Sequence, residues 1–271
     1  MNAVSEAGKQ VRDAPPEVRE RASGMAGLLL GGVLIALSWL LTGALPWPER
    51  VYATFLLGAL PAALFMARTP DSVPEEATRH GIYATSWAGL WGLAALAAAA
   101  SLSSGDVSRR LALEWPAGRL VAGWTALLIL AGALVVGVWY ALGHREGEIS
   151  RFLLPETTAE RAHFAWLAVT AGFAEEVVFR GFLVRAVEAA SGSVWVGVAA
   201  SAIVFGLAHR YQGAGGAVRA GVLGAILSAP LIVTGSIVPA ILAHAALDLT
   251  AGLWWRDRLF RETLVPTRSS I

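Results

Sequence analysis

Long apolar blocks, each about as long as a bilayer's hydrocarbon core is thick, constrain this chain more than any other feature. In the N-terminal half, the blocks cover residues 24–45, 51–67, 81–102 and 120–142. A helix rises about 1.5 Å per residue, so about 20 residues cross the hydrocarbon core. This half of the chain is therefore predicted to form four transmembrane helices.

The composition also favours a membrane protein and excludes several kinds of site. Only 15% of the 271 residues are charged, whereas a water-soluble domain has about 25%. The net charge of +1 gives no indication of a nucleic-acid partner. The chain has no cysteine, which excludes disulfides, zinc–thiolate sites and a catalytic thiol.

The C-terminal half also has helices of membrane-spanning length, but charged residues interrupt them. Residues 143–156 are predicted to form a polar loop, and the following Thr-Thr-Ala-Glu (157–160) is typical of a capping box with Thr157 as N-cap. The helix that starts there is expected to continue to about Ala190. A glycine-rich loop is expected at 212–216. Further apolar blocks cover 194–208, 218–234 and 237–255.

These patterns predict an all-α, polytopic membrane protein with about eight transmembrane helices and a polar chamber inside the membrane. Four segments are expected: a polar N-terminal tail (1–23), four N-terminal helices (24–142), a helical core (157–255) and a C-terminal tail (256–271). The arginine distribution favours both termini in the cytoplasm, although the loop with Arg109, Arg110 and Arg119 opposes this. Because arginine provides almost all basic residues, we expect a GC-rich bacterial genome and location in the bacterial cytoplasmic membrane.

Six ionisable side chains fall within or at the edges of the apolar helices of the C-terminal half. A charge at mid-bilayer costs about 2.5–3.5 kcal/mol on insertion scales, so such residues persist when they pair or line a wet cavity. If the three helices that carry them are neighbours, the six can converge on one chamber. They are Glu175, Glu176, Arg180, His209, His244 and Asp248.

The spacing of these residues indicates how they pair. Glu176 and Arg180 are four residues apart on one helix face and can form an ion pair. His244 and Asp248 share a face in the same way, as do Phe205 and His209. Glu175 is rotated about 100° from Glu176 and is expected to point elsewhere.

Each of these residues also has a structural interpretation. Glu176 and Arg180 can form a salt bridge that makes the helix insertable, and His209 can cap carbonyls at a helix end. His244 with Asp248 can be a buried pair that joins two helices. For Glu175 we find no structural partner in the sequence, which favours a functional role.

Three short motifs resemble those of a known family. Residues 175–180 match EExxxR, residues 205–209 match FxxxH, and residues 244–248 match HxxxN/D. In this order and spacing they resemble the motifs of the CPBP family of intramembrane proteases, which contains the CAAX-prenyl endopeptidases and bacterial abortive-infection and immunity proteins. The resemblance covers about residues 157–255.

The resemblance implies a glutamate-dependent endopeptidase that needs neither a cofactor nor a metal. Carried over by position, Glu175 is the general base, His209 helps to hold the attacking water, and His244 with Asp248 supports the oxyanion. Supporting roles fall to Glu176, Arg180 and Phe205. Asp248 stands where the prenyl proteases commonly have asparagine. An ionised aspartate cannot donate to an oxyanion, so it is expected to orient His244 and stabilise its protonated form.

The partners expected are membrane lipid and a protein or peptide substrate, with a lipidated tail or a C-terminal sorting tail as candidates. Three other classes stay open. Glu175, His209 and His244 could bind zinc in a metalloprotease, although HExxH spacing is absent. Chained acids and histidines also occur in proton relays and transporters, although no internal repeat is evident. A non-enzymatic immunity or scaffold protein could keep the motifs for packing.

Overall fold

The computed structural model describes residues 16–67, 73–144 and 147–255, and within these ranges the chain is helical without any strand. The all-α prediction is therefore confirmed for the described residues. Residues 1–15 of the predicted N-terminal tail and the whole predicted C-terminal tail (256–271) lie outside the described part of the chain.

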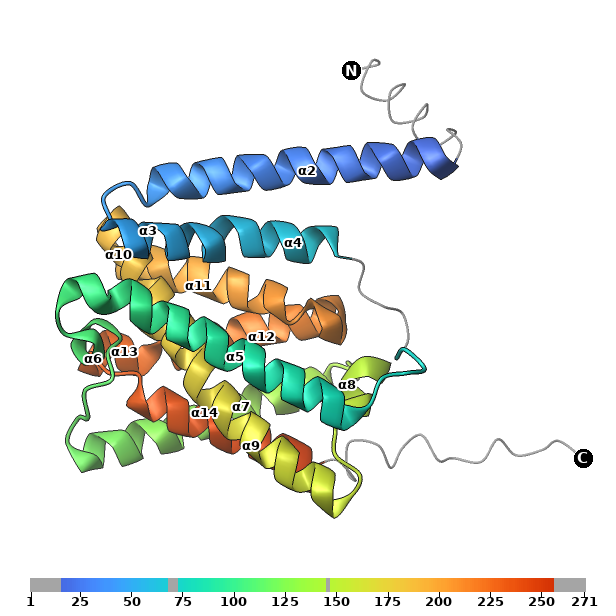
Figure 1. Cartoon of the computed structure of the whole chain (residues 1–271). Helices are drawn as coiled ribbons and strands as arrows, with labels where there is room; N and C mark the ends of the chain where they lie inside the picture. Colours follow the sequence, from blue (N-terminus) through green and yellow to red (C-terminus); the bar gives the residue numbers. More distant parts are fainter. Residues whose placement is uncertain (1–15, 68–72, 145–146, 256–271) are drawn as a thin grey trace, which may run out of the picture.

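The N-terminal half follows the predicted blocks closely. The helix α2 starts before the apolar block, within the segment that was expected to be a polar tail. Short helical turns join the longer helices at the end of the bundle where α2 stops (Figure 1). The elements are α2 (Pro16–Leu41), α3 (Trp47–Thr54), η1 (Phe55–Ala59), α4 (Leu60–Met66), α5 (Arg79–Ser101), η2 (Leu102–Ser104), α6 (Val107–Arg110) and α7 (Gly118–Ala141).

In the C-terminal half, a short helix (Glu148–Phe152) lies within the segment 143–156 that was predicted to be a loop. The predicted capping box is present at Thr157, whose hydroxyl oxygen accepts from the Glu160 amide at 3.1 Å. The long helix that starts there includes a central π-helical segment, η3. The elements of this half are α8 (Glu148–Phe152), α9 (Thr158–Glu175), η3 (Glu176–Val184), α10 (Arg185–Ser191), α11 (Val194–Ala208), η4 (Arg210–Gln212), α12 (Gly213–Leu227), α13 (Ala229–Thr234), α14 (Val238–Thr250) and η5 (Ala251–Trp255).

The prediction of a glycine-rich loop at 212–216 is wrong, because α12 already begins at Gly213. Gly213, with φ +83°, makes the turn into the helix. The following glycines serve close packing instead. A Cβ on Gly215 would lie 3.2 Å from the ring of Trp139, and one on Gly216 would lie 2.4 Å from the Cβ of Gln212.

The long helix α9–η3–α10 runs through the middle of a bundle in which successive long helices alternate in direction (Figure 1). It packs against α5 and α14 along α9, and against α11 along η3 and α10. The described chain begins and ends at the same end of the bundle. Residues of η3 are buried throughout, so this segment forms part of the core.

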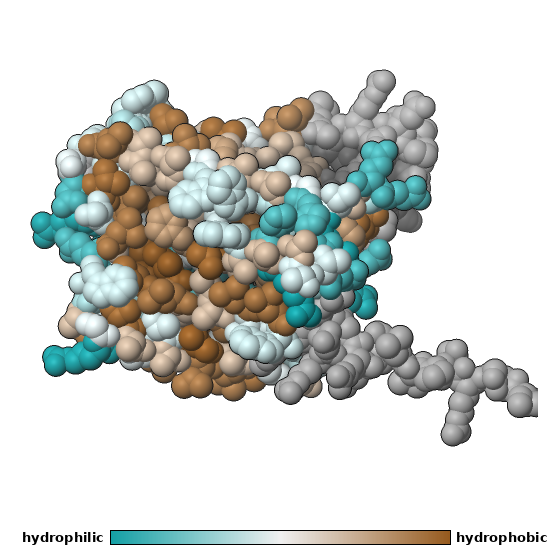
Figure 2. Space-filling view, turned by 60° about the horizontal axis from the view of Figure 1, so that its bottom comes forward, coloured by the Kyte–Doolittle hydropathy of each residue, from teal (hydrophilic) through white to brown (hydrophobic). Residues whose placement is uncertain are grey.

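Four helical stretches of the described residues are long and apolar enough to cross a membrane: Trp47–Met66, Arg79–Ser101, Gly118–Ala141 and Arg210–Thr234. Three shorter apolar helices cover Gly27–Leu41, Val194–Ala208 and Val238–Trp254. Figure 2 shows hydrophobic residues across the middle of one face and hydrophilic residues at its two ends. The count of eight transmembrane helices stays a prediction.

Glycines bring the helices of the C-terminal half into close contact. A Cβ on Gly172 of α9 would lie 2.7 Å from the backbone nitrogen of Ala245 in α14. A Cβ on Gly206 of α11 would lie 2.7 Å from the carbonyl oxygen of Ala217 in α12. Small residues that allow backbones to approach are typical of helix packing in membranes. This packing places the motif-bearing helices side by side.

Candidate active site

Two adjacent glutamates lie where the α-helix α9 passes into the π-helix η3. Glu175 is the last residue of α9 and Glu176 the first of η3. π-Helical turns are rare and occur frequently at functional sites. The side chain of Glu175 is 16% exposed, whereas that of Glu176 is fully buried.

The predicted ion pair between Glu176 and Arg180 is present. Nη1 of Arg180 donates to Oε1 of Glu176 at 3.0 Å, and both side chains have no exposed area. Nε of Arg180 donates to the carbonyl oxygen of Gly224 at 3.1 Å. The guanidinium also lies over the ring of Phe205, 4.3 Å from its centroid. The charge of Arg180 is thus matched by groups from three helical segments.

His244 links the two glutamates to Asp248. Its Nδ1 is 2.8 Å from Oε1 of Glu176. On the other side of the ring, Nε2 lies 3.6 Å from Oε2 of Glu175 and 3.6 Å from Oδ2 of Asp248. His244 and Asp248 therefore face each other along one helix, as predicted. Glu175, which was expected to point elsewhere, faces the same imidazole as Glu176, because the two ring nitrogens face opposite ways.

His209 lies next to this group through an aromatic ring. Its Nδ1 donates to the carbonyl oxygen of Phe205 at 2.8 Å, since a carbonyl can only accept. The ring of Phe205 is 4.5 Å from the ring of His209 and 6.2 Å from that of His244, measured between centroids. No hydrogen bond or ion pair joins His209 directly to Glu175 in the structure described.

Exposure rises in one direction across the site. The side chains of Glu176 and Arg180 are fully buried, that of His244 is 10% exposed, and that of Asp248 is 41% exposed. Three buried atoms of this site make no hydrogen bond within the described residues: Oε2 of Glu175, Oε2 of Glu176 and Nη2 of Arg180. Buried polar atoms are normally paired, so unpaired ones mark positions where polar groups of a ligand or water can bind.

Sequence reasoning missed the role of Gly224. A Cβ at this position would lie 2.6 Å from Nη2 of Arg180 and 3.1 Å from Cδ1 of Phe205. A side chain at this position would crowd the guanidinium, which lies over the Phe205 ring and donates to the carbonyl of Gly224. Gly224 lies outside the three motifs, and its contact with Arg180 joins two different helices. The sequence therefore gave no indication of its role.

Among the described residues, no three His, Asp or Glu side chains are arranged so that they could hold one metal ion. The arrangement of Glu175, His209 and His244 therefore gives no support to the predicted alternative of a zinc site. Glu175 and His244 do face each other at 3.6 Å, but His209 turns its Nδ1 to the Phe205 carbonyl.

The fold and the buried group of acids and histidines define a multi-pass helical membrane protein with ionisable side chains collected between its helices. Residues 157–250 match the family described as type II CAAX prenyl endopeptidase Rce1-like, a family of proteases. The matched segment contains all three motifs, and the match confirms the resemblance drawn from them. No curated protein and no solved structure matches the chain.

Proposed function

We propose that this protein is an intramembrane endopeptidase in which Glu175 activates a water molecule for attack on a peptide bond. The observation that carries the proposal is the position of His244, with Glu175 and Asp248 each 3.6 Å from Nε2 and Glu176 2.8 Å from Nδ1. One carboxylate, that of Glu176, accepts from Arg180 and His244, whereas that of Glu175 accepts no hydrogen bond within the described residues. The second of these, Glu175, is the candidate base.

The division of roles between the two glutamates follows from their partners. Glu176 accepts from Arg180 and from His244 through the same oxygen, Oε1, so this oxygen is committed to holding other side chains. A carboxylate in contact with a guanidinium is a pure acceptor, which places a proton on Nδ1 of His244. Glu176 and Arg180 therefore fix the imidazole so that Nε2 is directed toward Glu175 and Asp248.

The reaction then proceeds in two steps. Glu175 takes a proton from water while the water oxygen bonds to the carbonyl carbon of the substrate, and the resulting oxyanion accepts from Nε2–H of His244. Asp248 keeps that nitrogen protonated and oriented. Glu175 next gives its proton to the leaving nitrogen as the C–N bond breaks, leaving a carboxylic acid and an amine.

His209 is proposed to hold the attacking water. Its Nδ1–H is used by the Phe205 carbonyl, so in the neutral ring Nε2 carries a lone pair that can accept a hydrogen bond from water. Phe205 contacts both imidazoles and Arg180, and it is proposed to space them.

The substrate is proposed to be a peptide tail at the membrane surface, either lipidated or a C-terminal sorting tail. Asp248, the most exposed member of the site, would face the incoming chain. We also propose that both termini lie in the cytoplasm of a bacterial cell, which is consistent with the described chain beginning and ending at one end of the bundle.

The experiment uses the full chain in liposomes with two peptides, a farnesylated CAAX tail and a membrane-anchored sorting tail, in water enriched in ¹⁸O. Wild type should release a product with one ¹⁸O in its new carboxyl group. Glu175→Gln keeps the size of the side chain and removes the base, so turnover should fall by about 10²–10⁴-fold. Arg119→Gln, an exposed residue at the start of α7, is the matched control.

Two outcomes would favour other classes. Loss of activity after stringent chelation, with recovery on adding zinc, would support the metalloprotease. A Glu175→Gln variant that folds and keeps its biological effect would support the non-enzymatic immunity or scaffold protein.

A further inference from the structure

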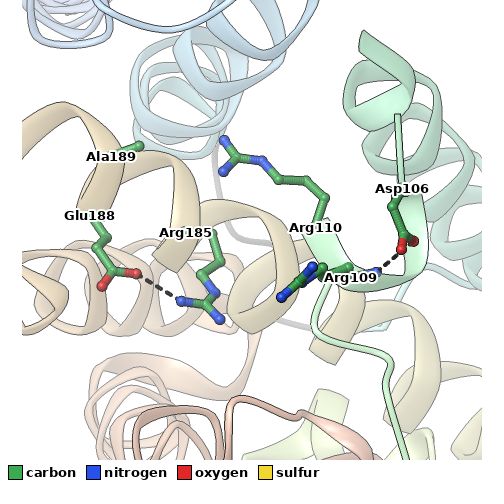
Figure 3. Close-up of a pocket in the computed structure, with 6 residues that line it drawn as sticks. All are labelled: Asp106, Arg109, Arg110, Arg185, Glu188 and Ala189. Carbon is green, nitrogen blue, oxygen red and sulfur yellow. Dashed lines mark hydrogen bonds and ion pairs between the residues drawn. The ribbon is translucent and has the colours of Figure 1, made fainter. Parts of the chain in front are cut away.

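A cavity of about 430 Å³ lies between α6 and α10, at the end of the bundle opposite to the first and last described residues. It is separate from the candidate active site, with which it shares no residue. Figure 3 shows the side chains of Arg109 and Arg185 extending toward each other across it, while Arg110 turns away. The lining residues are Asp106, Arg109, Arg110, Arg185, Glu188 and Ala189.

The arginines that line this cavity have many N–H donors that the nearby carboxylates do not use. Arg110 pairs with the buried Glu49, and Arg185 pairs through Nη1 with Glu188 at 3.2 Å. The guanidinium of Arg109 makes no hydrogen bond or ion pair with the described residues. A guanidinium has five N–H donors, so Arg109 keeps all of them and Arg185 keeps most.

Asp106 makes no ion pair with the guanidinium of Arg109 in the structure described, and one of its carboxylate oxygens caps the helix instead. Oδ1 of Asp106 accepts from the backbone N–H of Arg109 at 3.1 Å and from the hydroxyl of Ser108 at 2.8 Å. These bonds cap α6 and fix the backbone that carries the arginine. The acid thus positions the arginine while leaving its guanidinium available.

The segment that follows α6 anchors the cavity wall in the core. Leu111 and Ala112 are 2% and 1% exposed. The carbonyl oxygen of Ala112 accepts from the backbone N–H of Ile237 at 2.9 Å. A Cβ on Gly181 of η3 would lie 2.7 Å from the carbonyl oxygen of Leu111. Because this wall is packed against two other elements, the backbone that carries Arg109 and Arg110 is held in place before a ligand arrives.

We propose that this cavity binds a phosphate group, supplied by the headgroup of an anionic membrane lipid. Arginine recognises phosphate with two parallel N–H donors, and basic pockets between membrane helices bind lipid headgroups. The cavity is expected at the depth of the headgroups, since α5 ends shortly before α6 in the chain, and Leu102 and Trp115, which flank α6 in the sequence, are 66% and 68% exposed. Exposed tryptophan is typical of the membrane–water interface.

The test measures binding to the full chain in a non-ionic detergent. The probes are a short-chain phosphatidic acid, a phosphatidylcholine with the same chains, and inorganic phosphate, each followed by the shift in thermal unfolding temperature. Phosphatidic acid should stabilise the wild type, and phosphatidylcholine should not. Arg109→Gln should weaken the phosphatidic acid affinity about tenfold, and Arg109→Gln with Arg185→Gln about a hundredfold.

Arg119→Gln is the matched control, because it removes an exposed arginine at the same end of the bundle but outside the cavity; its affinity should equal that of wild type. Equal affinities in wild type and both cavity variants would overturn the proposal. Inorganic phosphate binding as tightly as phosphatidic acid, with the same loss in the variants, would overturn the lipid source. Arg109→Gln alone keeps the test valid if the double variant does not fold, since this guanidinium has no partner to lose.

Discussion

The fully buried pair of Glu176 and Arg180 makes a prediction about stability that can be worked out from its contacts. Arg180→Met removes the cation and leaves the Glu176 carboxylate with no exposed area and with His244 as its remaining partner. Removing one partner of a buried ion pair costs about 3–5 kcal/mol. The other lost bond adds little, because the carbonyl of Gly224 still accepts from the hydroxyl of Ser228 at 3.1 Å.

The matched double variant tests whether the uncompensated charge causes that loss. Glu176→Gln keeps an oxygen to face Nδ1 of His244 but removes the negative charge. Adding Glu176→Gln to Arg180→Met should therefore restore at least about 1.4 kcal/mol of the free energy of unfolding. This gain is expected even though the double variant lacks both members of the ion pair. A coupling of this sign is expected only if the two side chains interact directly.

The assay is equilibrium unfolding in mixed micelles with increasing mole fraction of a denaturing detergent, followed by the fluorescence of the 11 tryptophans. Arg119→Met, on an exposed surface, should change the free energy of unfolding by less than about 0.5 kcal/mol. The reasoning is refuted if Arg180→Met is as stable as this control, or if the losses of the two single variants simply add.

Three further predictions concern single positions. Gly224→Ala should destabilise by about 1–3 kcal/mol through overpacking against Arg180, whereas Gly123→Ala, with nothing within 4 Å, should be neutral or stabilising in the same unfolding assay. Thr157→Ala should cost about 0.5–2 kcal/mol by removing the N-cap of α9, and Thr157→Ser should restore most of this loss. The backbone N–H of Arg109 and the hydroxyl of Ser108 hold the pKa of Asp106 below its ordinary value of 3.8. The pKa of Asp106 is lower in the folded protein than in the unfolded one. Its cap on α6 therefore contributes stability above about pH 3.8 and loses this contribution as the pH falls through the folded-state pKa. Hydrogen exchange should therefore find the Arg109 amide protected at about pH 5 in the wild type and unprotected in Asp106→Ala.

The sequence predicted those features of the fold that depend on one helix at a time. The apolar block 81–102 became α5 (Arg79–Ser101), and the capping box at Thr157 starts α9, because length, hydropathy and capping are local properties. The glycines at 213–216 were misread as a loop. In membrane helices the same residues allow close packing, so glycine is a weaker sign of a break there than in soluble proteins.

The same limit applies to the candidate site. The pairs Glu176–Arg180 and His244–Asp248 were predictable, since residues four apart share a helix face. The bond between His244 and Glu176 joins residues 68 positions apart, and its existence depends on how closely α9 and α14 pack. That distance is set by Gly172, which lies outside the three motifs, against Ala245, which occupies an unspecified position of the third motif.

The exposure of the site residues divides the proposed active site into a rigid, buried side and a more accessible side. At the buried side, Arg180 and Glu176 hold one nitrogen of the imidazole with paired charges, so the ring of His244 has little freedom to turn. At the more exposed side, the other nitrogen faces Glu175 and Asp248 at 3.6 Å, which is too long for a hydrogen bond and leaves those oxygens able to bind a substrate or water. Each of the two adjacent glutamates is thus suited to one task. Exchanging their roles would need Arg180 to leave both Glu176 and the carbonyl of Gly224, with which it now forms hydrogen bonds.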